Sequence, residues 1–379
     1  MIVGVPKEVI PGERRVALVP ELVAKLIKAG LDVVVETGAG VAAGFLDSSY
    51  QTQGASLETD GLRAADVLLK VQPPTAEEIG KIKDGATLIG FVQPYTNAAG
   101  IQSLAARKVT VFAMELMPRI TRAQPMDALS AMSTVAGYKA VLMAANRLPK
   151  FFPLLMTAAG TVTPARVFVV GAGVAGLQAI GTAKRLGAVV EGYDTRPVVK
   201  EQVESLGAKF VELGLETKDA QAKTGYAKAQ SEEFYEKQRT MMLKYVAAAD
   251  VVIPTALVPG QRAPVLITEE MVKGMRAGSI IVDLAAEQGG NCALTETGQE
   301  VVKHGVVIMG PVNLPSTVPF HASQMYARTV TSYLLHLVKD GKVQLDLNDE
   351  LTRGPLATHQ GEILHEAVKA TLSAGAKPS

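Results

Sequence analysis

Short apolar runs alternate along the chain with segments whose apolar residues recur at helical spacing. In the first third, buried strands are predicted at Met1–Val5, Asp32–Glu36, Asp66–Val71, Ala86–Val92 and Val109–Met114. Pro20 precedes a helical pattern that stops at Gly30, and proline is favoured at the first position of a helix. Strands separated by helical segments indicate βαβ units and a parallel sheet.

The same alternation restarts after Pro153. Further strands are predicted at 166–170, 188–194, 250–254, 279–285 and 305–310, with helices at 127–148, 174–187 and from Ala322. The fold class is therefore α/β, with two Rossmann-like doubly wound parallel-sheet domains flanking a cleft and joined by the long helix after Asp127. We expect a first domain of residues 1–128 plus 320–379 and a nucleotide-binding domain of residues 129–319. The charged insertion Lys218–Tyr245 is either a solvated excursion or a lid.

Composition and charge give little support to several classes of function. Of the 379 residues, 48% are hydrophobic and 20% charged, and a net charge of +1 gives no argument for nucleic acid as a partner. The single cysteine, Cys292, rules out an intrachain disulfide and suits a reducing compartment. The low-charge stretch Phe151–Ala183 is interrupted by Pro153 and Pro164, so we expect no membrane-spanning segment and no signal peptide.

A glycine pattern points to a dinucleotide. Gly171, Gly173 and Gly176 have the G-x-G-x-x-G spacing directly after an apolar strand and at the start of a helix. Asp194 follows Gly176 by eighteen residues, at the end of the next strand, where the fingerprint has its ribose-binding acid. The alternative is a glycine-rich packing turn. Arg196 offers a partner for a 2′-phosphate, but the Asp194 carboxylate would repel that phosphate, so we predict NAD(H).

A second polar segment, Pro118–Asp127, is here called the polar loop. It ends the first domain, and Arg119, Gln124 and Asp127 are placed to contact the nicotinamide, its ribose and the phosphates. The alternative is a helix-capping loop with Asp127 as the N-cap and the arginines in solvent. The residues alone leave both interpretations open.

The chain resembles, nearly end to end, the family of alanine dehydrogenase and the NAD(H)-binding component of proton-translocating nicotinamide nucleotide transhydrogenase. The resemblance rests on GVPKE, ERRVALVPE, MELMPRITRAQPMD, TAAGTVTPARVFVVGAGVAGLQAIGTAKRLGA, KEQVESLGAKF, TALVPG and GSIIVDLAAEQGGN. The polar loop, with its arginine, glutamine and aspartate, is typical of the transhydrogenase branch.

The resemblance implies a role for individual residues. At the nicotinamide end these are Arg119, Gln124, Asp127 and Ser130. Around the dinucleotide they are Gly171, Gly173, Val174, Gly176, Asp194, Thr195, Arg196, Gln238 and Leu257. Gly225 and Tyr226 would belong to a mobile loop that closes on the nucleotide.

The two activities of this family make different chemical demands. Alanine dehydrogenase needs an arginine and a lysine for its substrate, matched by Arg15 and Lys70, and a histidine acid/base. That histidine is missing: Gln93 or a neighbour stands in its place, and Glu287 replaces an aspartate. Hydride transfer between two nicotinamides needs orientation and exclusion of water but no proton transfer. The missing histidine therefore favours transhydrogenation over an amino-acid dehydrogenase. Two alternatives stay open: a soluble amino-acid dehydrogenase that uses Arg15 and Lys70 with an unconventional acid, and a non-catalytic NAD sensor that uses the polar loop to dock a partner.

Because the chain has one glycine fingerprint, the resemblance places NADP(H) on a partner. The implied partners are a membrane-spanning alpha component and an NADP(H)-binding beta subunit, with the chain itself a homodimer. We expect no metal site. The resemblance implies a cytoplasmic protein, peripheral on the cytoplasmic side of the inner membrane, with hydride transfer coupled to proton translocation in the partner.

Overall fold

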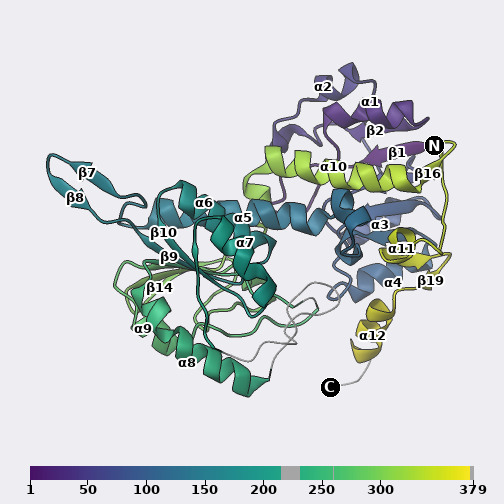
Figure 1. Ribbon diagram of the computed structural model, residues 1–379. Coiled ribbons are helices and arrows are strands. Elements are labelled where there is room, and N and C mark those ends of the chain that lie inside the picture. Colours follow the sequence, from purple (N-terminus) through teal and green to yellow (C-terminus); the bar gives the residue numbers. More distant parts are fainter. Residues whose placement is uncertain (215–230, 259, 376–379) are drawn as a thin grey trace. The chain divides into compact units, whose positions relative to one another are not determined.

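The computed structural model describes residues 1–214, 231–258 and 260–375. The chain forms two compact units, one made of Met1–Met132 with Pro315–Ser379 and the other of Ser133–Leu314 (Figure 1). Gly225 and Tyr226, predicted to contact the nucleotide, lie outside the described residues. Each unit has its own sheet with helices on it, which confirms the predicted α/β class with parallel sheets.

Eight strands of the described chain form the sheet of the first unit in the order β19-β18-β6-β5-β4-β1-β2-β3. Their bounds are β1 (Ile2–Val5), β2 (Asp32–Glu36), β3 (Ser56–Glu58), β4 (Val67–Leu69), β5 (Thr87–Gly90), β6 (Thr110–Ala113), β18 (Leu356–His359) and β19 (Glu362–Ile363). Strands β1 to β6 pair in parallel, whereas β18 runs antiparallel to β6 and β19 antiparallel to β18. The C-terminal segment thus extends the sheet that the N-terminal segment begins.

Helices cover the sheet of the first unit. They are α1 (Pro20–Lys28), α2 (Asp47–Thr52), α3 (Ala76–Lys81), α4 (Ala98–Ala106), α10 (Pro319–Leu337), α11 (Glu350–Arg353) and α12 (Glu366–Gly375), with short 3-10 turns η1 (Val41–Ala43), η2 (Met114–Leu116) and η3 (Thr121–Met126). A small hairpin, β16 (Val338–Lys339) and β17 (Lys342–Val343), follows α10. Helix α10 begins at Pro319 rather than at the predicted Ala322, because proline is pre-organised for the first helical turn. Tyr326 of α10 donates to the Lys70 carbonyl at 2.6 Å, so this helix lies directly on the strand ends.

The second unit contains a seven-stranded sheet, counted over its described residues, in the order β11-β10-β9-β12-β13-β15-β14. The strands are β9 (Arg166–Val170), β10 (Val189–Tyr193), β11 (Lys209–Phe210), β12 (Val251–Pro254), β13 (Ile280–Val282), β14 (Glu300–Lys303) and β15 (Val306–Met309). All pair in parallel except β14, which runs antiparallel to β15. The order reverses direction at β9, and such a switch point is where open α/β sheets bind ligands.

Both faces of this second sheet are buried, as its near-continuous apolar strands predict. The helices are α5 (Ala128–Arg147), α6 (Val174–Arg185), α7 (Lys200–Ser205), α8 (Glu232–Ala248) and α9 (Glu269–Lys273), with 3-10 turns η4 (Pro197–Val199), η5 (Ala286–Gln288) and η6 (Leu314–Thr317). Val167 and Val169 of β9 pack in a core with α5 and α6, whereas Phe168 and Val170 pack with α8 and α9. The sheet is therefore doubly wound.

Two features add to the predicted picture. A separate hairpin, β7 (Leu155–Thr157) and β8 (Gly160–Val162), projects from the second unit in a segment where the sequence analysis predicted no strand (Figure 1). Helix α5 agrees closely with the predicted helix 127–148 and is long and apolar enough to cross a membrane by length and composition alone. Buried core helices meet the same criteria of length and hydropathy, so this is weak evidence for a membrane-spanning helix.

Candidate functional site

The glycine turn between β9 and α6 has the geometry of a phosphate cradle. Gly171 has a φ of 100°, a conformation that side chains rarely adopt. A Cβ on Gly176 would lie 1.8 Å from the Gly171 carbonyl oxygen, so only glycine permits this close packing of helix on turn. Gly173 is the N-cap of α6 and provides no side-chain cap, and Val174 is the first helical residue. The helix N-terminus therefore presents backbone N–H groups of the kind that bind phosphates.

Asp194 is hydrogen-bonded to this turn. Its Oδ2 accepts a hydrogen bond from the Ala172 N–H at 2.8 Å and from the Arg196 guanidinium at 2.8 Å. Its Oδ1 accepts from the backbone N–H of Arg196 at 2.8 Å and from Nε at 2.9 Å. The bond to Asp194 raises the pKa of Arg196 further above its ordinary value. A buried carboxylate side chain thus stands beside the glycine turn, with Thr195 half-buried next to it.

Two predicted adenosine-side residues lie on neighbouring elements. Gln238 of α8 is 2% exposed, and its side chain lies next to that of Tyr193 at the end of β10. Gln238 Oε1 and Tyr193 Oη are buried atoms without a hydrogen-bond partner among the described residues. Leu257, half-buried, follows Thr255, whose hydroxyl donates to the Gly171 carbonyl at 3.0 Å. The second unit therefore brings Asp194 and the segment of Leu257 to the glycine turn and Gln238 to the neighbouring strand end, and the buried polar atoms without a partner among the described residues fit a polar ligand such as a dinucleotide.

In the first unit, the polar loop is folded around the 3-10 turn η3. Arg119 and Gln124 are exposed, whereas Asp127 and Ser130 are half-buried. Asp127 Oδ1 accepts from the Ser130 N–H at 2.8 Å, and Oδ2 accepts from the Ser130 hydroxyl at 2.6 Å. Asp127 therefore caps α5, as the second interpretation of the loop predicted. The cap holds the loop against the helix and leaves Gln124 at the surface.

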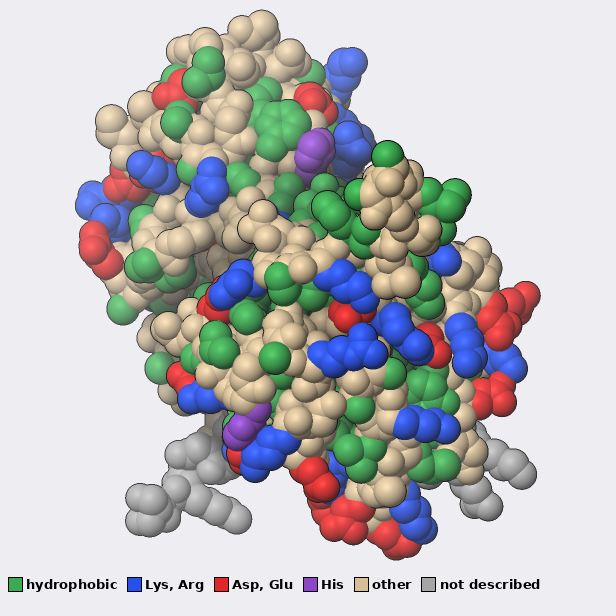
Figure 2. Space-filling view, turned by 90° about the vertical axis from the view of Figure 1, so that its left-hand side faces the viewer, with side chains coloured by type: hydrophobic (Ala, Val, Ile, Leu, Met, Phe, Trp, Pro, Cys, Tyr) green, Lys and Arg blue, Asp and Glu red, His purple; other side chains and the backbone are tan. Residues whose placement is uncertain are grey.

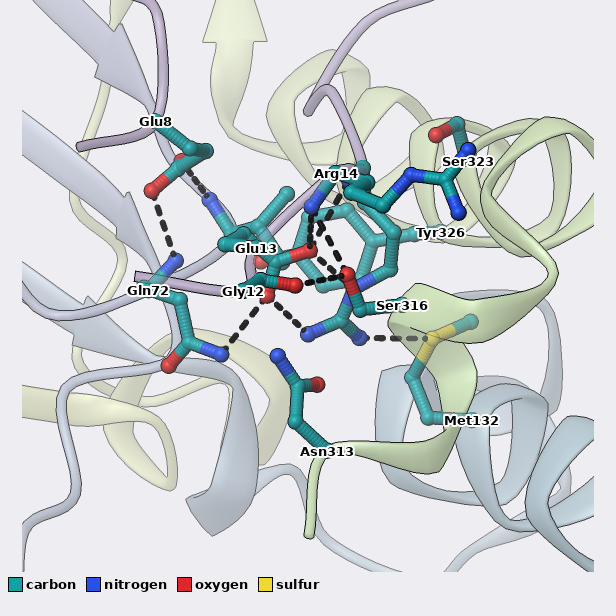
Figure 3. A network of polar contacts seen from close by, with 12 residues as sticks. Glu8, Gly12, Glu13, Arg14, Gln72, Met132, Asn313, Ser316, Ser323 and Tyr326 are labelled. Atoms are coloured by element: carbon teal, nitrogen blue, oxygen red, sulfur yellow. Dashed lines mark hydrogen bonds and ion pairs between the residues drawn. The ribbon is translucent and has the colours of Figure 1, made fainter. Parts of the chain in front are cut away.

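Arg15 and Lys70, matched to alanine dehydrogenase by the resemblance described above, are both buried. Two of the carboxylates that contact them, Glu13 and Glu8, belong to the polar network shown in Figure 3. Arg15 donates from Nε and from its terminal nitrogen to the two oxygens of Glu13, at 2.8 and 2.6 Å. Lys70 donates to Glu78 at 2.6 Å and lies 3.3 Å from Glu8. Burial alone would lower the pKa of Lys70, but Glu8 and Glu78 raise it above its ordinary value. Both cations are thus paired with carboxylates of their own chain.

Four of the five histidines have their contacts elsewhere. His304 contacts Glu269, His336 contacts Asp349, His359 contacts Thr110 and His321 packs edge-on against Phe320. Gln93, one of the residues expected where the resemblance implies a histidine, has a left-handed backbone with a φ of 53°. Glu287 accepts a hydrogen bond from the Asn313 N–H in the second unit.

Glu115 is a residue that the sequence analysis missed. Its Oε1 accepts from the backbone N–H groups of Val92 and Gln93 at 2.9 and 2.7 Å, and its Oε2 is buried without a partner in the described structure. Burial raises the pKa of this carboxyl to about 7, against the lowering effect of the two N–H groups. The only available signal was an acid inside the apolar run VFAMEL, which follows a strand.

A pH effect on stability follows from Glu115. Because its pKa in the folded protein is about 7 and its ordinary value is 4.5, the folded state holds a proton that the unfolded state loses earlier. Stability is therefore expected to fall as pH rises from 4.5 through 7, by at most about 3 kcal/mol. In Glu115→Gln this loss is expected to disappear. Urea unfolding should show that the free energy of unfolding of the wild type, relative to that of the variant, falls from pH 5 to pH 8. Glu77→Gln, at an exposed acid, should follow the wild type, and parallel curves for all three proteins would contradict the assignment.

Comparison with known proteins identifies close relatives. Models described as alanine dehydrogenase/PNT match this chain, the N-terminal domain at residues 4–136 and the C-terminal domain at residues 140–366. An NAD(P) transhydrogenase subunit alpha of Rhodospirillum rubrum is 50% identical over 97% of this chain and 99% of its own length. Alanine dehydrogenase of Bacillus subtilis is 32% identical over 97% of this chain and 94% of its own.

A solved structure agrees with these relatives. The crystal structure of transhydrogenase from Sinorhizobium meliloti superposes with a TM-score of 0.86 at 43% identity, covering 97% of this chain and all of that one. The predicted resemblance to this family is therefore confirmed. Identity to the transhydrogenase subunit exceeds identity to alanine dehydrogenase by 18 percentage points, from 50% and 32% over similar coverage.

Proposed function

The chain belongs to the alanine dehydrogenase/PNT family, and from that premise we propose that it is the NAD(H)-binding subunit of a proton-translocating transhydrogenase. Its relatedness to transhydrogenase alpha subunits makes it a transhydrogenase component, and membership of the family implies NAD(H) binding. The observation that carries the proposal is the glycine turn with Asp194 beside it, combined with an amide at Gln93 where an acid/base would be needed.

When bound, NADH supplies a hydride from C4 of its nicotinamide to C4 of an NADP⁺ held by a partner subunit, which yields NAD⁺ and NADPH. No proton is exchanged at the reacting carbons, so no residue of this chain needs to act as acid or base. The residues of the second unit hold the dinucleotide: the turn at Gly171–Gly176 and the start of α6 for the phosphates, and Asp194 for the adenosine ribose. The Asp194 carboxylate also repels a 2′-phosphate and so selects NAD(H) over NADP(H).

The polar loop supplies the orientation that the transfer requires. We assign Arg119, Gln124, Asp127 and Ser130 to the nicotinamide end, where they fix the ring and exclude water. Thr195, Arg196, Gln238 and Leu257 border the adenosine end. By the same proposal, the partners are a membrane-spanning alpha component and an NADP(H)-binding beta subunit. Coupling to proton translocation occurs in the membrane component, with this chain on the cytoplasmic side.

A hydride-transfer assay tests the function. Purified chain and NADH are mixed with an NADP⁺ analogue of distinct absorbance, with and without a purified NADP(H)-binding transhydrogenase subunit. We expect rapid transfer only when the partner is present. A parallel reaction with alanine and NAD⁺ tests the dehydrogenase alternative, for which Arg15 and Lys70 would supply the substrate contacts. Alanine oxidation by the chain alone, without partner-dependent transfer, would overturn the proposal.

We also propose that the chain is a homodimer held through the β7–β8 hairpin. A two-stranded hairpin alone is marginal in water, yet this one exposes Met156 (80%), and the segment leading into it exposes Phe151 (59%) and Leu154 (53%). Figure 2 shows the molecule from the side on which the hairpin projects in Figure 1, and hydrophobic side chains lie there beside lysine and arginine side chains. A second copy of the chain would bury the hairpin.

Met156→Asp is expected to weaken the dimer at least tenfold, because an ionised carboxylate would replace a buried apolar contact. Sedimentation equilibrium measures the dissociation constant. Thr157→Asp is the matched control: its side chain points to the opposite face, and aspartate can keep the bond that Thr157 accepts from the Ala159 N–H. A wild type that sediments as a monomer at all concentrations would contradict the proposal.

A further inference from the structure

One carboxylate links the polar loop to two other segments of the first unit. Asp349 Oδ1 lies 2.9 Å from the terminal nitrogen of Arg122, a residue of η3 in the polar loop. Its Oδ2 lies 2.9 Å from Nε2 of His336 on α10. Asp349 is also the N-cap of α11 and accepts from the Leu351 N–H at 3.2 Å. The loop is thus tied to a residue 227 positions away in the chain.

Further contacts fix the segment that carries Asp349. Tyr333 of α10 donates to the Leu351 carbonyl at 3.0 Å. A Cβ on Gly354 would lie 3.1 Å from Cδ of Pro118, so α11 packs tightly under the first residue of the polar loop. The Ala113 N–H donates to the Pro355 carbonyl at 2.8 Å, which joins the same segment to β6. The C-terminal segment therefore contacts the polar loop at its beginning and in its middle.

The burial and charge of Asp349 favour a stable contact with Arg122. The side chain of Arg122 is 64% exposed, and an isolated pair of this kind contributes little. Asp349 is only 18% exposed and takes three donors at once, so the carboxylate is held from three sides. Burial would raise the pKa of Asp349, but Arg122, the Leu351 N–H and His336 hold it below its ordinary value. The ionised form that binds Arg122 is thus the form present at neutral pH.

We propose that Asp349 is a positioning residue for the nicotinamide end of the site. By holding Arg122 in the middle of the polar loop, it keeps the exposed Arg119 and Gln124 on either side in one conformation. This inference rests on the proposed function, because orientation matters most where a hydride must cross a short gap. Small misplacements of such groups cost about a hundredfold in rate.

Asp349→Asn tests this role without removing the N-cap of α11. Asparagine caps helices as well as aspartate does, so α11 should remain, but the charge that holds Arg122 and His336 is lost. We expect the rate of hydride transfer at saturating NADH to fall about five- to tenfold, while the NADH dissociation constant changes less than about twofold. Arg122→Gln should give the same loss, and the double variant no further loss, because both remove one contact. Arg122→Lys should restore part of the rate.

Asp346→Asn is the matched control. Asp346 lies in the same segment, is exposed, and accepts from the Asn348 N–H, a neighbour two residues along the chain. It should leave the rate unchanged. Equal rates in Asp349→Asn and wild type, or equal losses in Asp349→Asn and Asp346→Asn, would overturn the inference.

Hydrogen exchange separates failure of this inference from failure of the proposed function, because it needs no reaction. Amide exchange of the peptide covering 117–127 should be faster in Asp349→Asn than in wild type and unchanged in Asp346→Asn. Unaltered exchange in Asp349→Asn would overturn the inference even where the wild type transfers hydride. A wild type without partner-dependent transfer would instead overturn the proposed function.

Discussion

Gly176→Ala is expected to abolish NADH binding, raising the dissociation constant more than about a hundredfold, or roughly 3 kcal/mol. The added Cβ would lie 1.8 Å from the Gly171 carbonyl oxygen and 2.9 Å from its carbon, and both are backbone atoms that cannot rotate away. Either the turn or the start of α6 must move, and these two segments form the phosphate cradle. Titration of NADH fluorescence measures the loss, and circular dichroism shows whether the remaining fold persists.

Gly181→Ala on the same helix is the matched control and should have the opposite effect on stability. There the new Cβ would meet Cδ2 of Leu206 at 3.7 Å, an ordinary van der Waals contact. Alanine favours a helix over glycine by about 1 kcal/mol, so the variant should be more stable and bind NADH normally. Wild-type affinity in Gly176→Ala would show that the dinucleotide does not bind at this turn.

The glycine turn could be predicted because its signal is local. The spacing of Gly171, Gly173 and Gly176, and Asp194 at the end of the next strand, lie within one βαβ unit whose geometry follows from the chain itself. The bond from the Ala172 N–H to Asp194 now explains why the acid stands beside the turn. Sequence reasoning worked where neighbouring elements alone determine which atoms meet.

The missed features depend on distant partners. Strand β18 pairs with β6, more than two hundred residues earlier in the chain. The spacing of apolar residues does not predict which distant strands pair. Asp349 is one acid among several in a polar stretch, and only its contact with Arg122 gives it a role. Glu115 is buried because of what packs around it, which no local spacing encodes. The β7–β8 hairpin was missed because a low-charge run containing Gly160 is also typical of a loop.

The polar loop shows how a local interpretation can be right and incomplete. Asp127 caps α5 through Ser130, as the capping interpretation predicted. Capping satisfies the helix, however, and does not explain why Gln124 is kept at the surface on a 3-10 turn interrupted by Pro125. A surface that is held rigid but not buried is what a binding loop requires, since loops carry function on a fixed scaffold.

Gln124→Asn is therefore expected to slow hydride transfer about ten- to hundredfold, equivalent to roughly 1.4–2.7 kcal/mol at the transition state. Asparagine keeps the amide but withdraws it by one methylene. The side chain is exposed, so the fold and the melting temperature should not change. In the proposed function the glycine turn and Asp194 hold most of the dinucleotide, so the NADH dissociation constant should stay within about twofold. Stopped-flow transfer to a partner-bound NADP⁺ analogue measures the rate.

Gln102→Asn provides the control, because Gln102 is an exposed glutamine of α4 in the same unit. It should transfer hydride at the wild-type rate. A slow Gln124→Asn with unchanged NADH affinity separates a catalytic component from an NAD sensor, since a sensor uses its loop for docking and has no transfer step to slow. Full activity in Gln124→Asn would remove that residue from the nicotinamide end and leave orientation to Arg119 and Asp127. A loss of affinity with an unchanged rate at saturating NADH would instead place Gln124 among the groups that bind NADH without favouring the transition state.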